Sequence, residues 1–148
     1  MNEENPSYVE FITGEGGVID TWLRRGAAGF RLDVADELPD DFIEKIRAAV
    51  KRVSPEKFLL GEVWEDATTK YGFGQRRTYL LGKGLDSVMN YPFKNAVLDF
   101  VKGKPAEQAM GEILSICEHY PAPAMDTALN FLSTHDTERA LTVIADEP

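Results

Sequence analysis

Residues 29–37 read Gly29-Phe30-Arg31-Leu32-Asp33-Val34-Ala35-Asp36-Glu37, an apolar, β-prone run that ends in acidic residues. A short apolar run bounded by glycine and then by carboxylates is typical of a buried strand in a parallel sheet. Arg31 and Asp33 lie two residues apart, so on a strand their side chains point to the same face. A guanidinium beside a carboxylate favours the ionised acid. The stretch therefore predicts a strand end that presents an oriented, charged carboxylate.

The same alternation of apolar strands and amphipathic helices continues along the chain. Strands are predicted at residues 29–34, 57–64, 86–90 and 128–132, and helices at 5–25 (interrupted by glycines), 39–53, 92–101, 106–120 and from about Thr137. The polar, glycine-containing stretch at 65–84 is predicted to be a long surface loop, and long loops in compact domains are usually functional. Strands that alternate with helices form a parallel sheet with right-handed crossovers, so the predicted fold class is α/β.

Polar side chains follow the end of each predicted strand. In a parallel sheet all C-terminal strand ends lie on one side, where (β/α)-barrel enzymes carry their catalytic groups. We therefore expect this edge to gather Asp33, Glu62, Asn90, His135 and Asp136. Carboxylates that converge from different strands suit glycoside hydrolysis, which needs a nucleophile or base and a separate proton donor.

The surroundings of the first two carboxylates differ in the sequence. Asp33 has Arg31 beside it, whereas Glu62 is followed by the apolar Val63 and Trp64. Apolar neighbours favour the neutral form of a carboxylic acid, and a cation favours the charged form. The residues thus suggest Asp33 as the nucleophile and Glu62 as the acid/base.

Simpler interpretations remain open at this point. Arg31 and Asp33 could form a structural ion pair, and Glu62 alone could be a solvated strand end. The acidic groups at the same edge could instead hold a hard cation, the candidate ligands being Asp33, Asp36, Glu37, His135 and Asp136. A zinc hydrolase is disfavoured because no closely spaced pair of histidines occurs.

Composition excludes other classes of partner. The 148 residues carry a net charge of −9, which disfavours nucleic acid and anionic membranes as partners. No apolar run approaches the roughly 18 residues that span a bilayer. The single cysteine, Cys117, cannot form a disulfide within the chain and is expected to be buried in a helix. The acidic N-terminal sequence is unlike a secretion signal, so a cytoplasmic location is expected.

Three motifs resemble signature regions of the α-amylase family, glycoside hydrolase family 13. Residues 29–35 resemble the second region, residues 61–64 (Gly-Glu-Val-Trp) the third, and residues 131–136 (Phe-Leu-Ser-Thr-His-Asp) the fourth. They occur in the order found in the family, each at a predicted strand end. Residues 86–93 and the Glu-Val-Trp form of the third region resemble the neopullulanase, cyclomaltodextrinase and maltogenic amylase branch.

The resemblance implies a role for each matching residue. Asp33 would be the nucleophile of a retaining mechanism with a covalent glycosyl-enzyme, Glu62 the general acid/base, and Asp136 the carboxylate that stabilises the transition state. The implied substrate-binding residues are Arg31, His135, Trp64 and Asn90. The implied substrates have α-1,4-glucosidic bonds, as in maltooligosaccharides, cyclodextrins, pullulan or starch. No cofactor is implied; some family members use calcium, and ligands for it are not evident in this sequence.

The resemblance covers nearly the whole chain but only part of the family's barrel. Residues 1–148 match the fourth to the seventh of its eight strands, and the first three strands and the last are lacking. We therefore expect a fragment of a single (β/α)8 catalytic domain. A partial barrel has open sheet edges, so we also expect it to associate with itself and to show little or no hydrolysis alone. A non-catalytic carbohydrate-binding or assembly fragment is the alternative.

Overall fold

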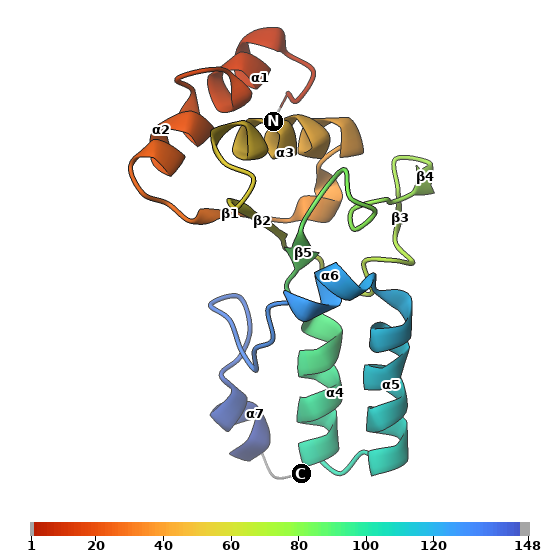
Figure 1. Cartoon of the computed structure of the whole chain (residues 1–148). Coiled ribbons are helices and arrows are strands. Elements are labelled where there is room, and N and C mark those ends of the chain that lie inside the picture. The colour runs from red at the N-terminus through yellow and green to blue at the C-terminus, as the bar shows by residue number, and fades with distance from the viewer. Residues whose placement is uncertain (1, 146–148) are drawn as a thin grey trace.

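The structure is a computed structural model that describes residues 2–145, and it is an α/β fold (Figure 1). Three short strands lie at its centre. In chain order the elements are α1 (Pro6–Thr13), α2 (Val18–Arg24), β1 (Gly29–Leu32), the 3-10 helix η1 (Ala35–Glu37), α3 (Asp40–Val53), β2 (Phe58–Gly61), β3 (Tyr71–Gly72), β4 (Gln75–Arg76), β5 (Ser87–Val88), α4 (Tyr91–Val101), α5 (Ala106–His119), α6 (Ala122–Asp126) and α7 (Ala140–Ala145).

The central sheet is parallel and has the order β1-β2-β5. Gly29 pairs with Phe58, and Leu60 pairs with Ser87, so the strands share one direction and one C-terminal edge. The predicted strand at 128–132 is reduced to one parallel bridge, between Leu129 and Met89. Within the described residues this segment has a neighbouring strand on one side only. The backbone N–H and C=O groups on its other side therefore have no strand to pair with. The partial (β/α)-barrel is confirmed, with a shorter fourth strand than predicted.

Three further segments differ from the sequence-based expectation. The predicted helix at 5–25 is two helices, because α1 ends at Gly14 and Gly16 adopts a left-handed backbone with φ +76°. The predicted loop at 65–84 contains a small antiparallel hairpin, β3–β4. Its turn residues, Phe73 and Gly74, both have positive φ, as a two-residue type I′ hairpin requires. The last helix begins at residue 140, three residues later than predicted.

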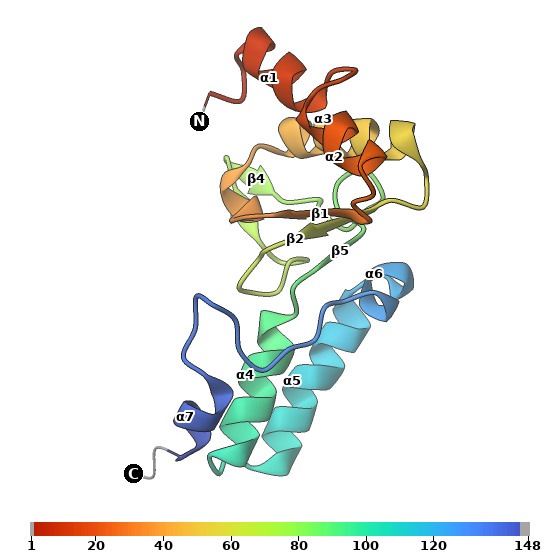
Figure 2. The ribbon, with the colours of Figure 1, turned by 90° about the vertical axis from the view of Figure 1, so that its left-hand side faces the viewer.

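Helices cover the two regions of the sheet differently (Figure 2). The amphipathic helix α3 packs its apolar stripe on the strands, and α1 and α2 contribute to the same apolar cluster. This cluster is the main core and contains the fully buried Val50 and Leu59. The antiparallel pair α4 and α5 projects from the end of β5. A smaller apolar cluster lies on the other face of the strands and consists of Leu60, Met89, Tyr91, Phe58 and Phe131.

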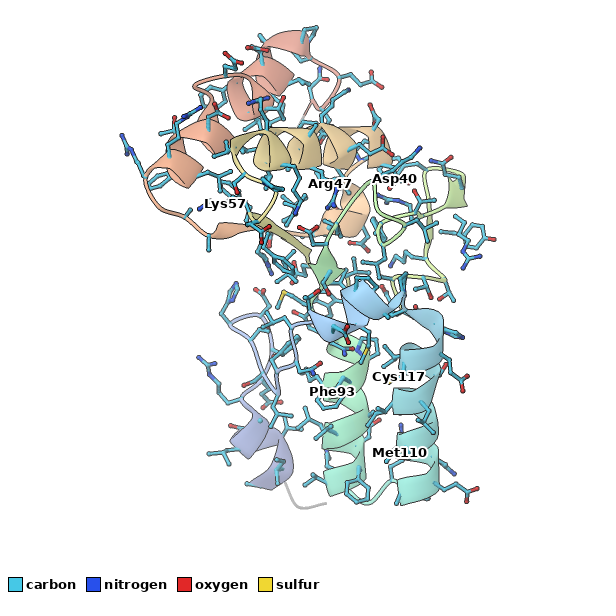
Figure 3. The ribbon with its side chains drawn as sticks, viewed as in Figure 1. Asp40, Arg47, Lys57, Phe93, Met110 and Cys117 are labelled. Atoms are coloured by element: carbon cyan, nitrogen blue, oxygen red, sulfur yellow. The ribbon has the colours of Figure 1, made fainter. Side chains whose placement is uncertain are left out.

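The surface of the helices corrects one expectation. Cys117 lies on α5 with its thiol exposed, not buried as predicted (Figure 3). Cys117 lies on the solvent-facing side of α5. Of the residues in this helix, only Ala109 and Ile116 are buried. Among residues 2–145, every helix is too short or too polar to cross a lipid bilayer.

Asp86 fastens α3 to the sheet at the start of β5. Its carboxylate contacts Arg47 Nη1 at 2.7 Å and Lys51 Nζ at 2.8 Å, and it accepts a hydrogen bond from the Leu59 N–H at 2.8 Å. Arg47 projects from α3 toward the strands, as Figure 3 shows. Burial raises the pKa of Asp86, but the three donors, two of them cationic, outweigh burial and hold the pKa below its usual 3.8.

Asp86→Asn is expected to destabilise the chain in a pH-dependent way. A carboxylate with a lowered native pKa contributes stability above its unfolded value, 3.8, and loses that contribution as the pH falls through the native value. The free energy of unfolding of the parent chain should therefore exceed that of Asp86→Asn most above pH 3.8. Urea unfolding followed by circular dichroism at several pH values measures the difference.

Asp41→Asn serves as the control for this experiment. Asp41 lies on the same helix and pairs with Lys45 at 3.1 Å, but its side chain is 71% exposed. Exposed pairs of this kind contribute little to stability. A difference between Asp86→Asn and the parent chain that does not change with pH would contradict the role given to the Asp86 carboxylate.

Candidate active site

Arg31 joins the ends of two neighbouring strands. Its Nη1 is bound to Asp33 Oδ1, and its Nη2 lies 2.9 Å from Glu62 Oε1. Nη2 satisfies no hydrogen-bond geometry, so this second contact is a charge–charge attraction. The Nε–H donates to Met89 Sδ at 3.5 Å, which directs the guanidinium across the sheet. One side chain thus holds both predicted catalytic carboxylates.

The backbone after β1 is bent to reach Glu62. Val34 has φ 43°, a left-handed conformation that is unfavourable for a β-branched residue. This conformation points the Val34 N–H at Glu62 Oε2, with a hydrogen bond of 2.9 Å. The next N–H, of Ala35, donates to the carbonyl oxygen of Glu62 at 3.0 Å. Strain of this kind is characteristic of functional sites, and here it fixes the position of a carboxylate.

Glu62 is buried among polar donors and not in apolar surroundings as predicted. Its side chain is 3% exposed, and Oε1 accepts hydrogen bonds from Trp64 Nε1 at 3.1 Å and from the Tyr91 hydroxyl at 3.2 Å. Successive side chains of an extended segment point to opposite faces, so Val63 faces the main core and not Glu62. Trp64 lies on the same face as Glu62 but offers it an N–H. The expectation based on apolar neighbours was therefore wrong for Glu62.

These groups open into one cleft of about 460 Å³. Its lining contains five carboxylates, those of Asp33, Asp36, Glu62, Glu65 and Asp136. The ring of Trp64 and the side chain of Val34 complete it. Asp33 reaches into it with a side chain that is 76% exposed, and Asp136 with one that is 41% exposed. A deeply held carboxylate and an exposed one therefore face the same space, the arrangement that a proton donor and a nucleophile need.

The predicted substrate-binding residues have different positions. Trp64 is half-exposed at the cleft and stacks on Tyr91, with ring centroids 4.7 Å apart. His135 is exposed and its Nε2 lies 3.1 Å from Asp136 Oδ2, so it neighbours the cleft through that carboxylate. Asn90 is fully buried: its Oδ1 caps α4 by accepting from the Phe93 N–H, and its Nδ2 donates to the Asn130 side chain. The expected contact of Asn90 with substrate finds no support in this position.

Several residues of the site were missed by sequence reasoning. Lys70 from the long loop lies between two cleft carboxylates, with Nζ 2.9 Å from Asp36 Oδ2 and 2.5 Å from Glu65 Oε2. Hydrogen bonds to these two carboxylates raise its pKa, so Lys70 stays charged. Tyr91, which bonds Glu62, was missed as well. The only signal for Lys70 was its place in a long loop next to a signature motif.

Two acidic residues of the cleft are paired with cationic side chains of the chain. Within residues 2–145, His, Cys, Asp and Glu side chains nowhere gather in a group of three or more that could hold a metal ion. The candidate ligands Asp33 and Asp36 are already paired with Arg31 and Lys70. The charges of these two carboxylates are thus balanced by cations that the chain itself supplies.

Comparison with known proteins identifies one group of relatives. The family described as "Alpha amylase, catalytic domain" matches residues 1–148. The chain is 36% identical to a cyclomaltodextrinase of Bacillus sp. over 148 residues, which covers 96% of this chain and 24% of the relative. It is 35% identical to neopullulanase 2 of Thermoactinomyces vulgaris over 144 residues, 96% of this chain and 23% of the relative.

Solved structures give the same result. The cyclic α-maltosyl-(1→6)-maltose hydrolase of Arthrobacter globiformis superposes with a TM-score of 0.86 at 28% identity, over 99% of this chain and 31% of that one. A cyclomaltodextrinase superposes with a TM-score of 0.85 at 35% identity, over 99% of this chain and 24% of that one. The chain spans about a quarter of the length of the cyclomaltodextrinase and of the neopullulanase named above.

Proposed function

The chain belongs to the α-amylase family, glycoside hydrolase family 13, and on this premise we propose that the whole protein cleaves α-1,4-glucosidic bonds with retention of anomeric configuration. The proposed substrates are maltooligosaccharides, cyclodextrins, pullulan or starch. The relatives named cyclomaltodextrinase and neopullulanase support this class. One observation carries the proposal: Arg31 holds an exposed Asp33 and a buried Glu62 at the C-terminal edge of one sheet.

The proposed reaction has two steps. Asp33 attacks the anomeric carbon and forms a glycosyl ester while the glycosidic C–O bond breaks, and Glu62 gives its proton to the departing oxygen. A water molecule then attacks the same carbon, Glu62 takes its proton, and Asp33 leaves as a carboxylate. Retention requires the two carboxyl groups to be about 5–5.5 Å apart. Two carboxylates bound to one guanidinium are compatible with such a short separation. Asp136, which lines the same cleft, would bind sugar hydroxyl groups.

The 148-residue chain alone is proposed to hydrolyse little or nothing. Asp33 and Asp136 are widely exposed, so the cleft does not exclude water around the reacting groups. A chromogenic maltooside assayed with the isolated chain and with the whole protein tests the proposal, and the anomer first released is read by proton NMR. Release of the α-anomer by the whole protein is expected. The β-anomer, or no release, would refute the proposed function, and binding without hydrolysis would favour a carbohydrate-binding fragment.

We further propose that the isolated chain associates with itself through the free edge of β1. Among the described residues β1 pairs only with β2, so the backbone groups on its other edge have no strand partner. Copies with a net charge of −9 repel one another, so association should strengthen with salt. Light scattering coupled to size exclusion at low and high salt is the measurement. A monomer under both conditions at high concentration contradicts the proposal.

A further inference from the structure

Tyr91 brings a hydroxyl group from a different βα unit to the buried carboxylate of the cleft. It is the first residue of α4 and is 1% exposed. Its ring stacks against Trp64 and meets the edge of Phe131 at a centroid distance of 4.8 Å. Its hydroxyl lies 3.2 Å from Glu62 Oε1. The stack on Trp64 fixes the plane of the Tyr91 ring, and the hydroxyl extends from that plane to Glu62.

We infer that Tyr91 is a positioning residue for Glu62. The Tyr91 hydroxyl keeps Glu62 Oε1 as a hydrogen-bond acceptor and leaves Oε2 to carry the transferable proton. It also couples Glu62 to the segment that bears Asp136. The inference rests on the proposed function only in calling Glu62 the acid/base. The contacts themselves are independent of any activity.

The choice between the two oxygens follows from their partners. Oε1 accepts from both the Tyr91 hydroxyl and Trp64 Nε1, and Arg31 lies beside it. Among residues 2–145, Oε2 accepts only from the Val34 N–H. A proton on Oε1 would have to displace one of these donors, since a carboxylic O–H oxygen has less accepting capacity than a carbonyl oxygen. A proton on Oε2 displaces nothing.

The Tyr91 hydroxyl remains a donor over the working pH range. Burial raises the pKa of Tyr91, and the negative charge of Glu62 acts in the same direction. A hydrogen bond from the Thr134 side chain opposes them, but the pKa stays above its usual value of 10. A hydroxyl that donates to the Tyr91 oxygen makes the Tyr91 O–H a stronger donor to Glu62.

Thr134 extends the contact to the third carboxylate. Its Oγ1 accepts a hydrogen bond from the Asp136 N–H at 3.2 Å. A relay from the Asp136 backbone through Thr134 and Tyr91 to Glu62 Oε1 is part of this inference, and its two outer bonds are those of Asp136 to Thr134 and of Tyr91 to Glu62. A shift of the Asp136 segment would change the hydrogen bond that Glu62 receives.

Other charged groups also face Glu62 and must be constant in a test. These are Arg31 and Asp33 at the end of β1, and the other carboxylates that line the cleft, Asp36, Glu65 and Asp136. None is altered when Tyr91 is replaced by phenylalanine, which keeps the stacked ring and removes only the hydroxyl. Hydrogen bonds to a charged acceptor are stronger than those to a neutral one, so losing this donor disfavours the carboxylate form.

Tyr91→Phe is therefore expected to raise the pH midpoint of the Glu62 titration by about one pH unit, the effect of one hydrogen bond to a carboxylate. The readout is the carboxyl 13C shift of Glu62 in the 148-residue chain labelled on glutamate, with the signal assigned by its loss in Glu62→Gln. Thr134→Val should move the midpoint in the same direction by less. Phe131→Leu disturbs the packing on Tyr91 but leaves its hydroxyl, and should not move the midpoint.

The outcomes separate this inference from the proposed function. An unchanged midpoint in both Tyr91→Phe and Thr134→Val overturns the inference, even if the whole protein is an active glycosidase. An upward shift supports it, even if no hydrolysis is found. In an active whole protein, Tyr91→Phe should also move the alkaline limb of the pH profile of kcat/KM upward. If Tyr91→Phe does not fold, the difference in the midpoint between Thr134→Val and Phe131→Leu decides.

Discussion

Asp33→Asn is expected to lower kcat of the whole protein on maltooligosaccharides by about 10⁴-fold or more, the scale of losing a catalytic nucleophile. The amide keeps the shape of the side chain but cannot form the glycosyl ester. Glu62→Gln is expected to cost about 10²–10⁴-fold, because it removes general acid–base catalysis and leaves the nucleophile in place. Steady-state hydrolysis with the folded state checked by circular dichroism measures both.

The two roles differ in their dependence on the leaving group. A substrate whose leaving group is already a stable anion needs no proton, so the first step of Glu62→Gln should recover on a fluoride or nitrophenyl glycoside. Asp33→Asn should not recover. Asp36→Asn is the matched control, since Asp36 lines the same cleft but is paired with Lys70. Equal recovery in both catalytic variants would show that the roles were assigned to the wrong residues.

Arg77→Met is expected to lower the free energy of unfolding by about 3–5 kcal/mol, the cost of breaking a buried ion pair. The Arg77 side chain is fully buried, and its Nε donates to Asp40 Oδ1 at 2.8 Å. Nη1 donates to the carbonyl oxygen of Asp36 at 2.7 Å, and the guanidinium lies 4.4 Å from the ring centroid of Tyr79. Arg77 thus ties the loop that carries β3–β4 to the segment that follows β1.

Urea unfolding of the chain measures this effect, and Arg76→Met is the control. Arg76 is the neighbouring residue and is exposed. Its side chain makes one hydrogen bond within the described residues, from Nε to the carbonyl oxygen of Thr68. Surface changes of this kind usually stay within about 0.5 kcal/mol. Limited proteolysis should also cut the hairpin at 71–76 faster in Arg77→Met. Equal stability of the two variants would contradict the anchoring role.

The strand ends of the site could be predicted because their signal is local. The run at 29–37 contains a strand, its guanidinium and its carboxylate within a few residues, and the motif at 61–64 does the same for Glu62. The parallel order of the strands then follows from their alternation with helices. Family membership could also be predicted, since all three motifs occur within the 148 residues in the order found in the family.

The partners of these carboxylates could not be predicted because they are distant in the sequence. Tyr91 reaches Glu62 across 29 residues, and Arg77 reaches Asp40 across 37. Neither contact leaves a trace in local periodicity. The apolar environment assigned to Glu62 failed for a different reason: adjacency in sequence was taken for proximity, although Val63 points away from Glu62. The length of the strand at 128–132 depends on its neighbours, which composition does not reveal.

The left-handed backbone at Val34 makes this position a site at which protein engineering can raise stability without altering the cleft. Asparagine tolerates φ 43° better than valine, and Val34 is 41% exposed, so Val34→Asn would relieve about 1–2 kcal/mol of strain at little loss of packing. Because asparagine favours the same backbone conformation, the substitution keeps the N–H that binds Glu62 Oε2 in place. Changes of this kind, which relieve backbone strain, are among those that stabilise a protein without changing its fold.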